Sequence, residues 1–139
     1  MRSRPVSTPN QTRHLSVCVG QDARKACAFL SRPENFPQWA SGLAESLQKI
    51  GGEWVAQTPE GPAKVRFSEP NDLGVLDHWV ALQSGVEIYV PLRIIANGSG
   101  CELVLTIFRR PGATDEQFAA DADWVMRDLQ AAKKLLEKL

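Results

Sequence analysis

The sequence is poor in the residues that build metal and disulfide sites. It has two histidines, His14 and His78, and three cysteines, Cys18, Cys27 and Cys101, with no C-x-x-C spacing. Because no histidine pair stands at metal-ligand spacing and the cysteines are scattered, we expect no metal site and no cofactor. An odd number of dispersed cysteines is typical of reduced thiols, so we expect a cytoplasmic protein without disulfides.

Excess charge and long apolar runs are also missing. The 16 basic and 16 acidic residues cancel, so the chain lacks the basic footprint of a nucleic-acid binder. No apolar run approaches the roughly 18 residues that span a bilayer, and we expect no integral membrane association. The first residues, MRSRPVSTPNQTR, have no apolar segment after their arginines, unlike a secretory signal. There is no G-x-S-x-G nucleophile elbow.

What remains is the composition of one globular domain. The chain has 139 residues, of which 43% are hydrophobic, enough to bury a real core. Residues 1–13 carry two prolines and several small polar residues without periodicity, so we expect a disordered tail there. The domain itself is expected over residues 14–139.

The pattern after the tail predicts a strand, a helix, a run of strands and a final helix. His14–Val19 alternates as a strand does. Asp22 can cap a helix in which Ala23, Ala26, Cys27 and Leu30 share one face. Pro33 and Pro37 then bound a short irregular or helical turn. The strands that follow are expected at Leu43–Ile50, Glu53–Thr58, Ala63–Glu69, Leu73–Leu82, Val86–Ala96 and Cys101–Arg110.

The last two strands allow a prediction of register. Asn97-Gly98 favours a two-residue type I′ turn, since both residues tolerate positive φ. Counting outward gives an apolar face with the pairs Ile94–Cys101, Leu92–Leu103, Val90–Leu105 and Ile88–Ile107. On the opposite face the same count pairs Arg93 with Glu102, as a surface ion pair worth under about 1 kcal/mol. A three-residue turn at Gln83-Ser84-Gly85 adds Leu76, His78, Val80 and Leu82 to the apolar face.

The final helix, Thr114 to Leu139, is the most clearly marked element. Thr114 and Gln117 form a capping box. Its apolar stripe is made by Phe118, Ala122, Val125, Leu129, Ala132 and Leu136. A long helix that closes a curved sheet tends to enclose space. Trp124 and Leu135 lie off the stripe, and two interpretations stay open for them: a contact between two copies in a homodimer, or packing on the first helix.

This order of elements resembles the helix-grip fold, and the segment Ser31-Arg32-Pro33-Glu34-Asn35-Phe36-Pro37-Gln38-Trp39 resembles the loop after the first helix of the START-like (SRPBCC) superfamily. Within it, the chain is similar to bacterial polyketide cyclase/dehydrase and lipid-transport-like proteins, relatives of Bet v 1. The resemblance implies an α+β fold, with a curved antiparallel sheet of six or seven strands wrapped around a long C-terminal helix and two short helices between the first two strands. It also implies a hydrophobic cavity between sheet and helix. It does not imply catalysis, because carriers and cyclases share this fold.

His78 is the main candidate site residue, because its imidazole falls on an otherwise apolar face. Three roles stay open for it: a hydrogen-bonded structural histidine, a ligand contact, or a general acid/base. Asp77 is not expected to orient it, since adjacent strand residues point to opposite faces. The other candidate ligand contacts, each also explicable as plain core, are Phe36, Trp39, Phe67, Val90, Leu105, Val125, Met126 and Leu129.

The leading hypothesis is therefore a protein that binds a hydrophobic or aromatic small molecule, lipid- or polyketide-like, in an internal cavity. The alternative is a cyclase or dehydratase that uses His78 as general acid/base. A third hypothesis is an interaction module with a collapsed cavity, acting through Trp124 and the outer face of the sheet.

Overall fold

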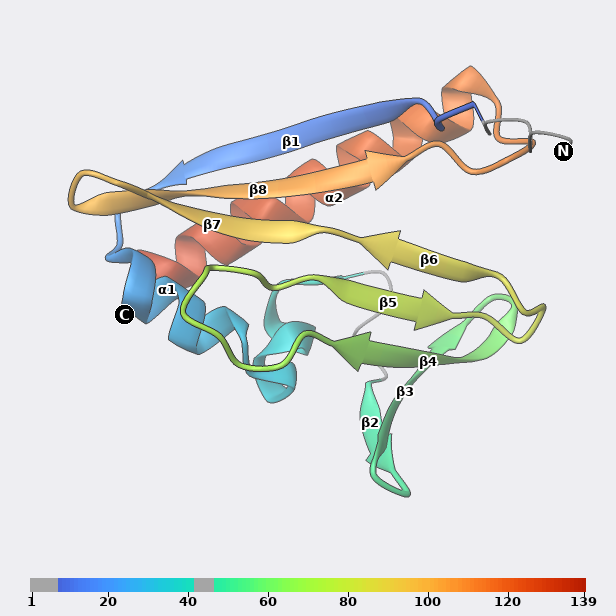
Figure 1. The fold of residues 1–139 in the computed structure, drawn as a ribbon, viewed down its shortest axis with the longest axis horizontal. Helices are drawn as coiled ribbons and strands as arrows, with labels where there is room; N and C mark the ends of the chain where they lie inside the picture. Colours follow the sequence, from blue (N-terminus) through green and yellow to red (C-terminus); the bar gives the residue numbers. More distant parts are fainter. Residues whose placement is uncertain (1–7, 42–46) are drawn as a thin grey trace, which may run out of the picture.

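The structure, a computed structural model, describes residues 8–41 and 47–139. It is built from a curved antiparallel sheet, two α-helices and one 3₁₀ helix (Figure 1). The helices are α1 (Ala23–Leu30), η1 (Pro33–Gln38) and α2 (Asp115–Leu136). The strands are β1 (Thr12–Val19), β2 (Gln48–Ile50), β3 (Glu53–Thr58), β4 (Gly61–Phe67), β5 (His78–Ala81), β6 (Glu87–Val90), β7 (Leu92–Asn97) and β8 (Gly100–Phe108).

The sheet has two parts that meet at Pro91. One part has the strand order β1-β8-β7, and the other has the order β2-β3-β4-β5-β6. Pro91 separates β6 from β7 because it has no N–H to donate to a neighbouring strand. Its carbonyl still accepts from the Thr106 N–H at 3.1 Å, and a bridge between Val75 and Arg93 joins the loop before β5 to β7. The predicted fold class is confirmed, although the described residues form eight strands rather than the predicted six or seven. The predicted strand Val86–Ala96 is broken at this proline.

The first elements form as predicted. The Asp22 carboxylate caps α1 by accepting from the N–H groups of Arg24 and Lys25, at 3.1 and 3.2 Å. The predicted turn after it is η1. β1 begins at Thr12, two residues before the predicted start. Residues 1–7 of the predicted tail and residues 43–46 of the predicted strand 43–50 lie outside the described residues.

The predicted strand Leu73–Leu82 is wrong in its first half. The Asn71 side chain accepts from the N–H groups of Leu73 and Val75 and donates to the Val75 carbonyl, which folds this stretch into a loop. Gly74 has a φ of +73°, and a Cβ there would lie 2.3 Å from the Ile94 carbonyl oxygen. The loop therefore presses its backbone against β7, and β5 starts only at His78.

The predicted register of β7 and β8 is wrong by two residues. The turn is Gly98-Ser99, with a φ of +58° only at the glycine, which is the type II′ pattern. Ile94 therefore pairs with Leu103 rather than with Cys101. Because side chains alternate with period two, a shift of two leaves every residue on its predicted face. The shift does move Arg93 away from Glu102, to a position opposite Val104.

The last helix closes the fold. The Thr114 hydroxyl accepts from the Gln117 N–H at 3.1 Å, and the Gln117 side chain accepts from the Thr114 N–H at 2.9 Å, so the capping box is confirmed. The predicted stripe is buried except for Val125, which is half-buried. At the other end of the helix, the Glu137 carboxylate accepts from the Gly20 N–H at 2.7 Å. Leu135 packs against the core, while Trp124 remains 47% exposed.

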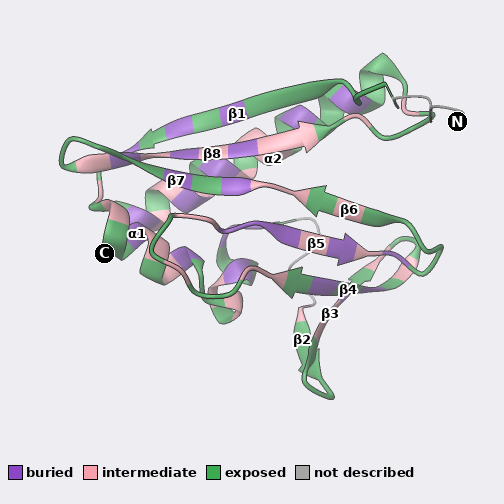
Figure 2. Ribbon diagram, in the orientation of Figure 1, coloured by how far each residue is buried: buried purple, intermediate pink, exposed green. Residues whose placement is uncertain are grey.

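The core is divided, and this division positions the site. The larger cluster lies between α2 and the strands β1, β8 and β7, where Figure 2 shows alternating buried residues. α2 packs along β1 and β8, and in Figure 1 it lies behind them rather than behind β4 and β5. A smaller cluster of Ala63, Val80 and Leu82 lies on β4, on β5 and directly after β5. α2 thus covers less of the inner face of β5 and β6 than of the inner face of β1 and β8.

Candidate functional site

A cavity of about 700 Å³ lies between the sheet and the first half of α2. We call it the sheet–helix cavity. Its volume is within the range of roughly 300–1,000 Å³ that is usual for small-molecule sites. Its inner wall is mainly apolar and is formed by Phe36, Trp39, Ala40, His78, Val80, Leu82, Ile88, Val90, Leu105, Ile107 and Val125.

His78 lies in an aromatic cluster on this wall. Its ring centroid is 5.2 Å from that of Phe36 and 6.1 Å from that of Phe67, and the residue is 6% exposed. Burial lowers the pKa of the imidazole to about 4, although a hydrogen bond with the Leu76 backbone and the charge of Asp77 act in the opposite direction. The imidazole is therefore neutral at pH 7, with one donor and one acceptor nitrogen.

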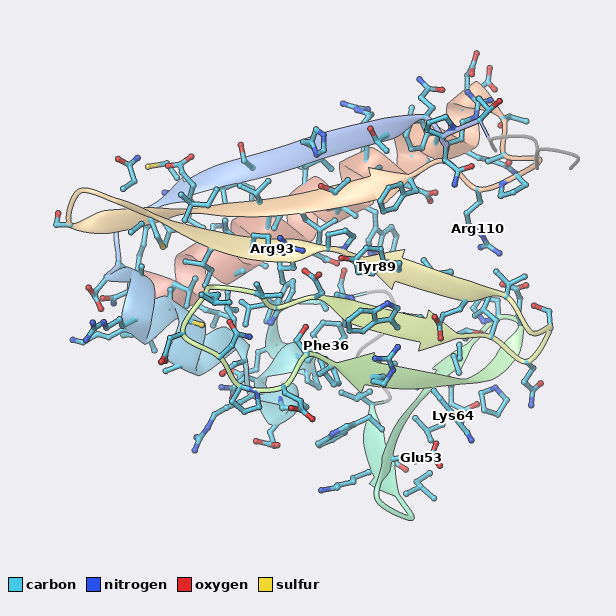
Figure 3. The ribbon with its side chains drawn as sticks, in the orientation of Figure 1. Phe36, Glu53, Lys64, Tyr89, Arg93 and Arg110 are labelled. Carbon is cyan, nitrogen blue, oxygen red and sulfur yellow. The ribbon has the colours of Figure 1, made fainter. Side chains whose placement is uncertain are left out.

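Asp77 points to the other face of the sheet, as predicted. Its carboxylate accepts from the Leu92 N–H at 3.0 Å, from the Tyr89 hydroxyl at 2.5 Å, and from the Arg93 Nε and Nη2 at 2.8 Å each. Figure 3 shows Tyr89 and Arg93 on the adjoining strands β6 and β7. The hydrogen bonds from Arg93 lower the pKa of Asp77 to about 2, against the effect of burial. The Asp-His pair is thus not a catalytic dyad.

Trp39 contributes the other polar group of the inner wall. Its ring meets Phe36 edge-on, with centroids 5.2 Å apart. The residue is 4% exposed, and its indole Nε1 finds no hydrogen-bond acceptor within the part of the chain that the structure describes. Nearby in sequence, the N–H and hydroxyl of Ser41 donate to Asp128 Oδ1 at 3.2 and 2.6 Å. These bonds join the end of the η1 segment to α2.

Charged groups also belong to the lining of the cavity. Four carboxylates belong to its lining, those of Glu60, Glu87, Asp121 and Asp128. Burial raises the pKa of Asp128, although the two bonds from Ser41 lower it. Two arginines also belong to the lining. Arg109 is engaged with Asp115 at 2.6 Å and with the Ala113 carbonyl, while Arg110 is exposed (Figure 3).

The structure brings six of the nine predicted contacts into this lining: Phe36, Trp39, His78, Val90, Leu105 and Val125. The other three lie elsewhere. The Phe67 ring meets the rings of Trp54 and Phe36 edge-on, and Phe67 lines a different hollow. Leu129 has no exposed surface, and Met126 packs against the larger core cluster.

Asp128 was not among the contacts predicted from the sequence, although a signal for it exists. Asp128 stands three residues after Val125, and Asp121 stands four residues before it. Residues at these spacings share a helix face. Carboxylates beside a half-buried stripe residue were therefore detectable as cavity candidates. Trp124 was noticed for its position off the stripe, but it lines the sheet–helix cavity and its ring contacts Arg127.

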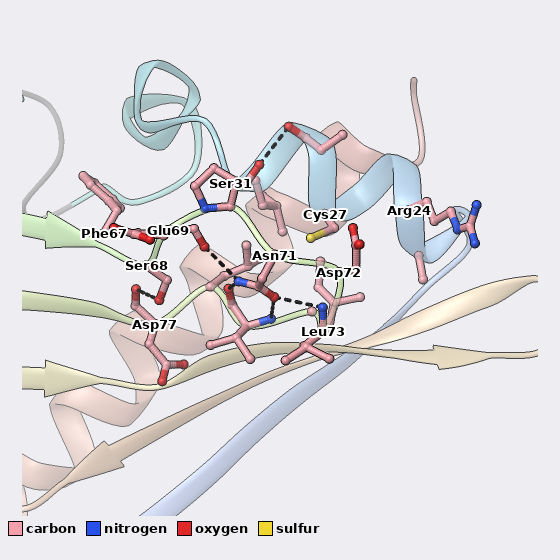
Figure 4. A pocket seen from close by; sticks show the side chains of 18 of the residues that line it. Arg24, Cys27, Ser31, Phe67, Ser68, Glu69, Asn71, Asp72, Leu73 and Asp77 are labelled. Carbon is pink, nitrogen blue, oxygen red and sulfur yellow. Dashed lines mark hydrogen bonds between the residues drawn. The ribbon is translucent and has the colours of Figure 1, made fainter.

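A second hollow of about 700 Å³ lies between α1 and the loop of residues 68–77 (Figure 4). Asn71 orders this loop through the hydrogen bonds that the figure shows. Cys27 also lines the hollow, but burial and the nearby Asp72 raise the pKa of its thiol. A thiol that stays protonated is a poor nucleophile. The sheet–helix cavity is therefore the better candidate site.

No protein-family model and no curated protein matches the chain. Within residues 8–41 and 47–139, three or more metal-binding side chains do not gather at one place. A helix long and apolar enough to cross a membrane is also not found in that part of the chain.

Solved structures do match. A START superfamily protein from Mycobacterium smegmatis superposes with a TM-score of 0.67 at 13% identity, over 91% of this chain and 97% of the other. Ara h 8.0201, which is Bet v 1-like, superposes with a TM-score of 0.63 at 9% identity, over 93% of this chain and 99% of the other. DynU16, from the dynemicin biosynthetic locus, superposes with a TM-score of 0.67 at 14% identity. The match covers 93% of this chain and 48% of DynU16. The chain therefore has the helix-grip fold of the START-like proteins, as its order of elements predicted.

Proposed function

We propose that the protein binds a hydrophobic or aromatic small molecule, lipid- or polyketide-like, in the sheet–helix cavity. The observation that carries this proposal is an apolar cavity of about 700 Å³ with a buried, neutral histidine in its wall. Apolar lining supplies affinity through burial of ligand surface, and a few polar groups fix its orientation. His78 is the residue that we assign to this polar contact.

The state of His78 favours binding over proton transfer. A general base works best when its pKa is near the operating pH. The pKa of His78 is about 4, so at pH 7 it has no proton to give as an acid and is a weak base. A neutral imidazole whose N–H donates to the Leu76 backbone still offers its other nitrogen to a ligand as a hydrogen-bond acceptor.

Calorimetric titration and thermal-shift screening with aromatic polyketide, isoprenoid and fatty-acid ligands test the proposal. Val125→Phe places a larger side chain in the cavity and should abolish binding of every hit. Val104→Phe is the matched control, because Val104 lies on the opposite face of β8 from Leu105. Hits that bind Val125→Phe as tightly as the wild type would place the ligand elsewhere.

His78→Phe tests the polar contact, since it keeps an aromatic ring and removes both nitrogens. We expect affinity to fall about tenfold for hits with a polar group, the equivalent of one ordinary hydrogen bond. Unchanged affinity for all hits would remove His78 from the site while leaving the cavity in place.

Asp128 favours a second candidate function, a cyclase or dehydratase. It supplies a carboxyl group with raised pKa in the lining that also contains His78, and an enolisation needs two such groups. Exchange of the acidic C–H of benzoylacetone in D₂O tests this. The enzyme hypothesis predicts exchange faster than with heat-inactivated protein, and slower exchange in His78→Phe and Asp128→Asn. A rate equal to that of inactivated protein would exclude it for this substrate type.

A further inference from the structure

The indole N–H of Trp39 is a buried donor that the described part of the chain leaves unpaired. The residue is 4% exposed and belongs to the lining of the sheet–helix cavity. Across residues 8–41 and 47–139, no acceptor lies within hydrogen-bond distance of Nε1. Buried donors in native proteins are nearly always paired, so this exception requires an explanation.

Among the residues that the structure describes, the surroundings of Trp39 do not supply the missing acceptor. Its closest ring neighbour is Phe36, at 5.2 Å between centroids, and that ring has no lone pair to offer. Asp128 Oδ1 already accepts two hydrogen bonds from Ser41. A phenylalanine would fill an apolar wall without a polar cost, whereas a tryptophan brings a donor that needs a partner.

We infer that Trp39 donates a hydrogen bond to an oxygen acceptor of the bound molecule, and that this molecule is a neutral carbonyl compound rather than a carboxylate. This inference rests on the proposed function, since it names the ligand class of the same cavity. A ligand without an acceptor leaves the indole N–H unpaired, as it is in the free protein. An oxygen-bearing ligand gains a hydrogen bond with this donor, which favours its binding.

The charges of the lining favour the neutral ligand over the anion. Glu60, Glu87, Asp121 and Asp128 contribute four carboxylates, against two arginines, of which Arg109 is already paired with Asp115. The inner wall near Trp39 is apolar, and His78 is neutral there. Moving a carboxylate into such a site costs far more than moving a ketone.

Three compounds of nearly equal shape separate these cases: fluorene, 9-fluorenone and fluorene-9-carboxylate. Calorimetric titration should show 9-fluorenone binding about tenfold more tightly than fluorene, the equivalent of about 1.4 kcal/mol. The carboxylate should bind most weakly. In Trp39→Phe, the preference for 9-fluorenone over fluorene should disappear. Trp79→Phe makes the same change on the outer face of the sheet, where Trp79 stacks on Tyr89 at 5.3 Å, and should keep the preference.

A second readout does not depend on any variant folding. In ¹⁵N–¹H spectra of the wild type, saturation with 9-fluorenone should move the Trp39 indole proton downfield, and saturation with fluorene should not. An unmoved Trp39 indole signal, or equal affinities for fluorene and 9-fluorenone, would overturn this inference and leave cavity binding intact. Tighter binding of the carboxylate would overturn the choice of a neutral ligand. Failure of all three compounds to bind would count against the proposed function itself.

Discussion

Asp77 binds Arg93 through two parallel hydrogen bonds of 2.8 Å, from Nε to Oδ1 and from Nη2 to Oδ2. The carboxylate is 6% exposed and the guanidinium side chain 47%. The contact joins the start of β5 to β7 across the junction at Pro91. Since Asp77 is fixed on the outer face, the next residue, His78, is directed to the inner face. The outer ion pair and the cavity histidine are thus linked through one peptide unit.

Asp77→Ala should lower the free energy of unfolding by about 2–3 kcal/mol, because it removes hydrogen bonds to a charged group and leaves the Leu92 N–H unpaired. Chemical denaturation measures this. Glu53→Ala is the matched control, since both side chains of the Glu53–Lys64 pair are exposed. This variant should lower the free energy of unfolding by less than about 1 kcal/mol. An equal decrease in the free energy of unfolding of the two variants would show that the Asp77 contact stabilises the protein no more than an exposed ion pair does.

The acid dependence of stability should show two separate windows. The pKa of His78 is lowered to about 4 in the folded state, so the unfolded chain binds a proton first, and stability should fall as pH drops from about 6.5 to 4. The pKa of Asp77 is lowered to about 2, so its stabilisation is present above about pH 4 and is lost only below that.

His78→Phe separates the two windows, because it should remove the slope between pH 6.5 and 4 and leave the slope below pH 4. Denaturation at a series of pH values measures both. A direct NMR titration of the imidazole is the independent check. A midpoint near 6.5 for His78 would contradict its burial.

Gly74→Ala should destabilise the protein more than Gly85→Ala. Both glycines have positive φ, +73° and +91°, so both substitutions carry backbone strain on the order of 1 kcal/mol. A Cβ at Gly74 would also lie 2.3 Å from the Ile94 carbonyl oxygen, whereas nothing lies within 4 Å of one at Gly85. Thermal unfolding of the two variants gives the comparison. Equal melting temperatures would mean that the loop does not press against β7.

Thr114→Ala should cost about 1 kcal/mol of stability, the usual value of an N-cap. The Thr114 hydroxyl accepts from the Gln117 N–H at 3.1 Å, and Thr114→Ser keeps that oxygen. The serine variant is therefore expected to unfold within a few tenths of a kcal/mol of the wild type. Similar losses in both variants would assign the effect to something other than the cap.

The face of each strand could be predicted because it depends on alternation alone. His78 falls on the inner face whether the hairpin turn is Asn97-Gly98 or Gly98-Ser99, since the two registers differ by an even number. The register itself depends on the choice between two short turns that share Gly98, and the sequence does not distinguish their energies. The capping box of α2 was predictable because both partners are three residues apart.

Contacts between distant residues were not predictable in the same way. The pairing of Asp77 with Arg93 depends on the break at Pro91 and on the loop before β5, and it joins residues that are 16 positions apart in the sequence. Phe67 was expected in the cavity as a wall residue, and it does lie opposite His78 on the neighbouring strand. Its ring instead turns toward Trp54 and Phe36 and lines the other hollow. Side-chain direction at the end of a strand is decided by such neighbours.

Intermolecular NOEs test the central claim most directly. With the tightest ligand of the screen at saturation, we expect NOEs from ligand protons to the methyl groups of Val90, Leu105 and Val125, which line the cavity. The methyl groups of Val104, on the opposite face of the sheet, should give none. A saturated complex whose ligand protons contact Val104 and miss those three residues would contradict binding between sheet and helix.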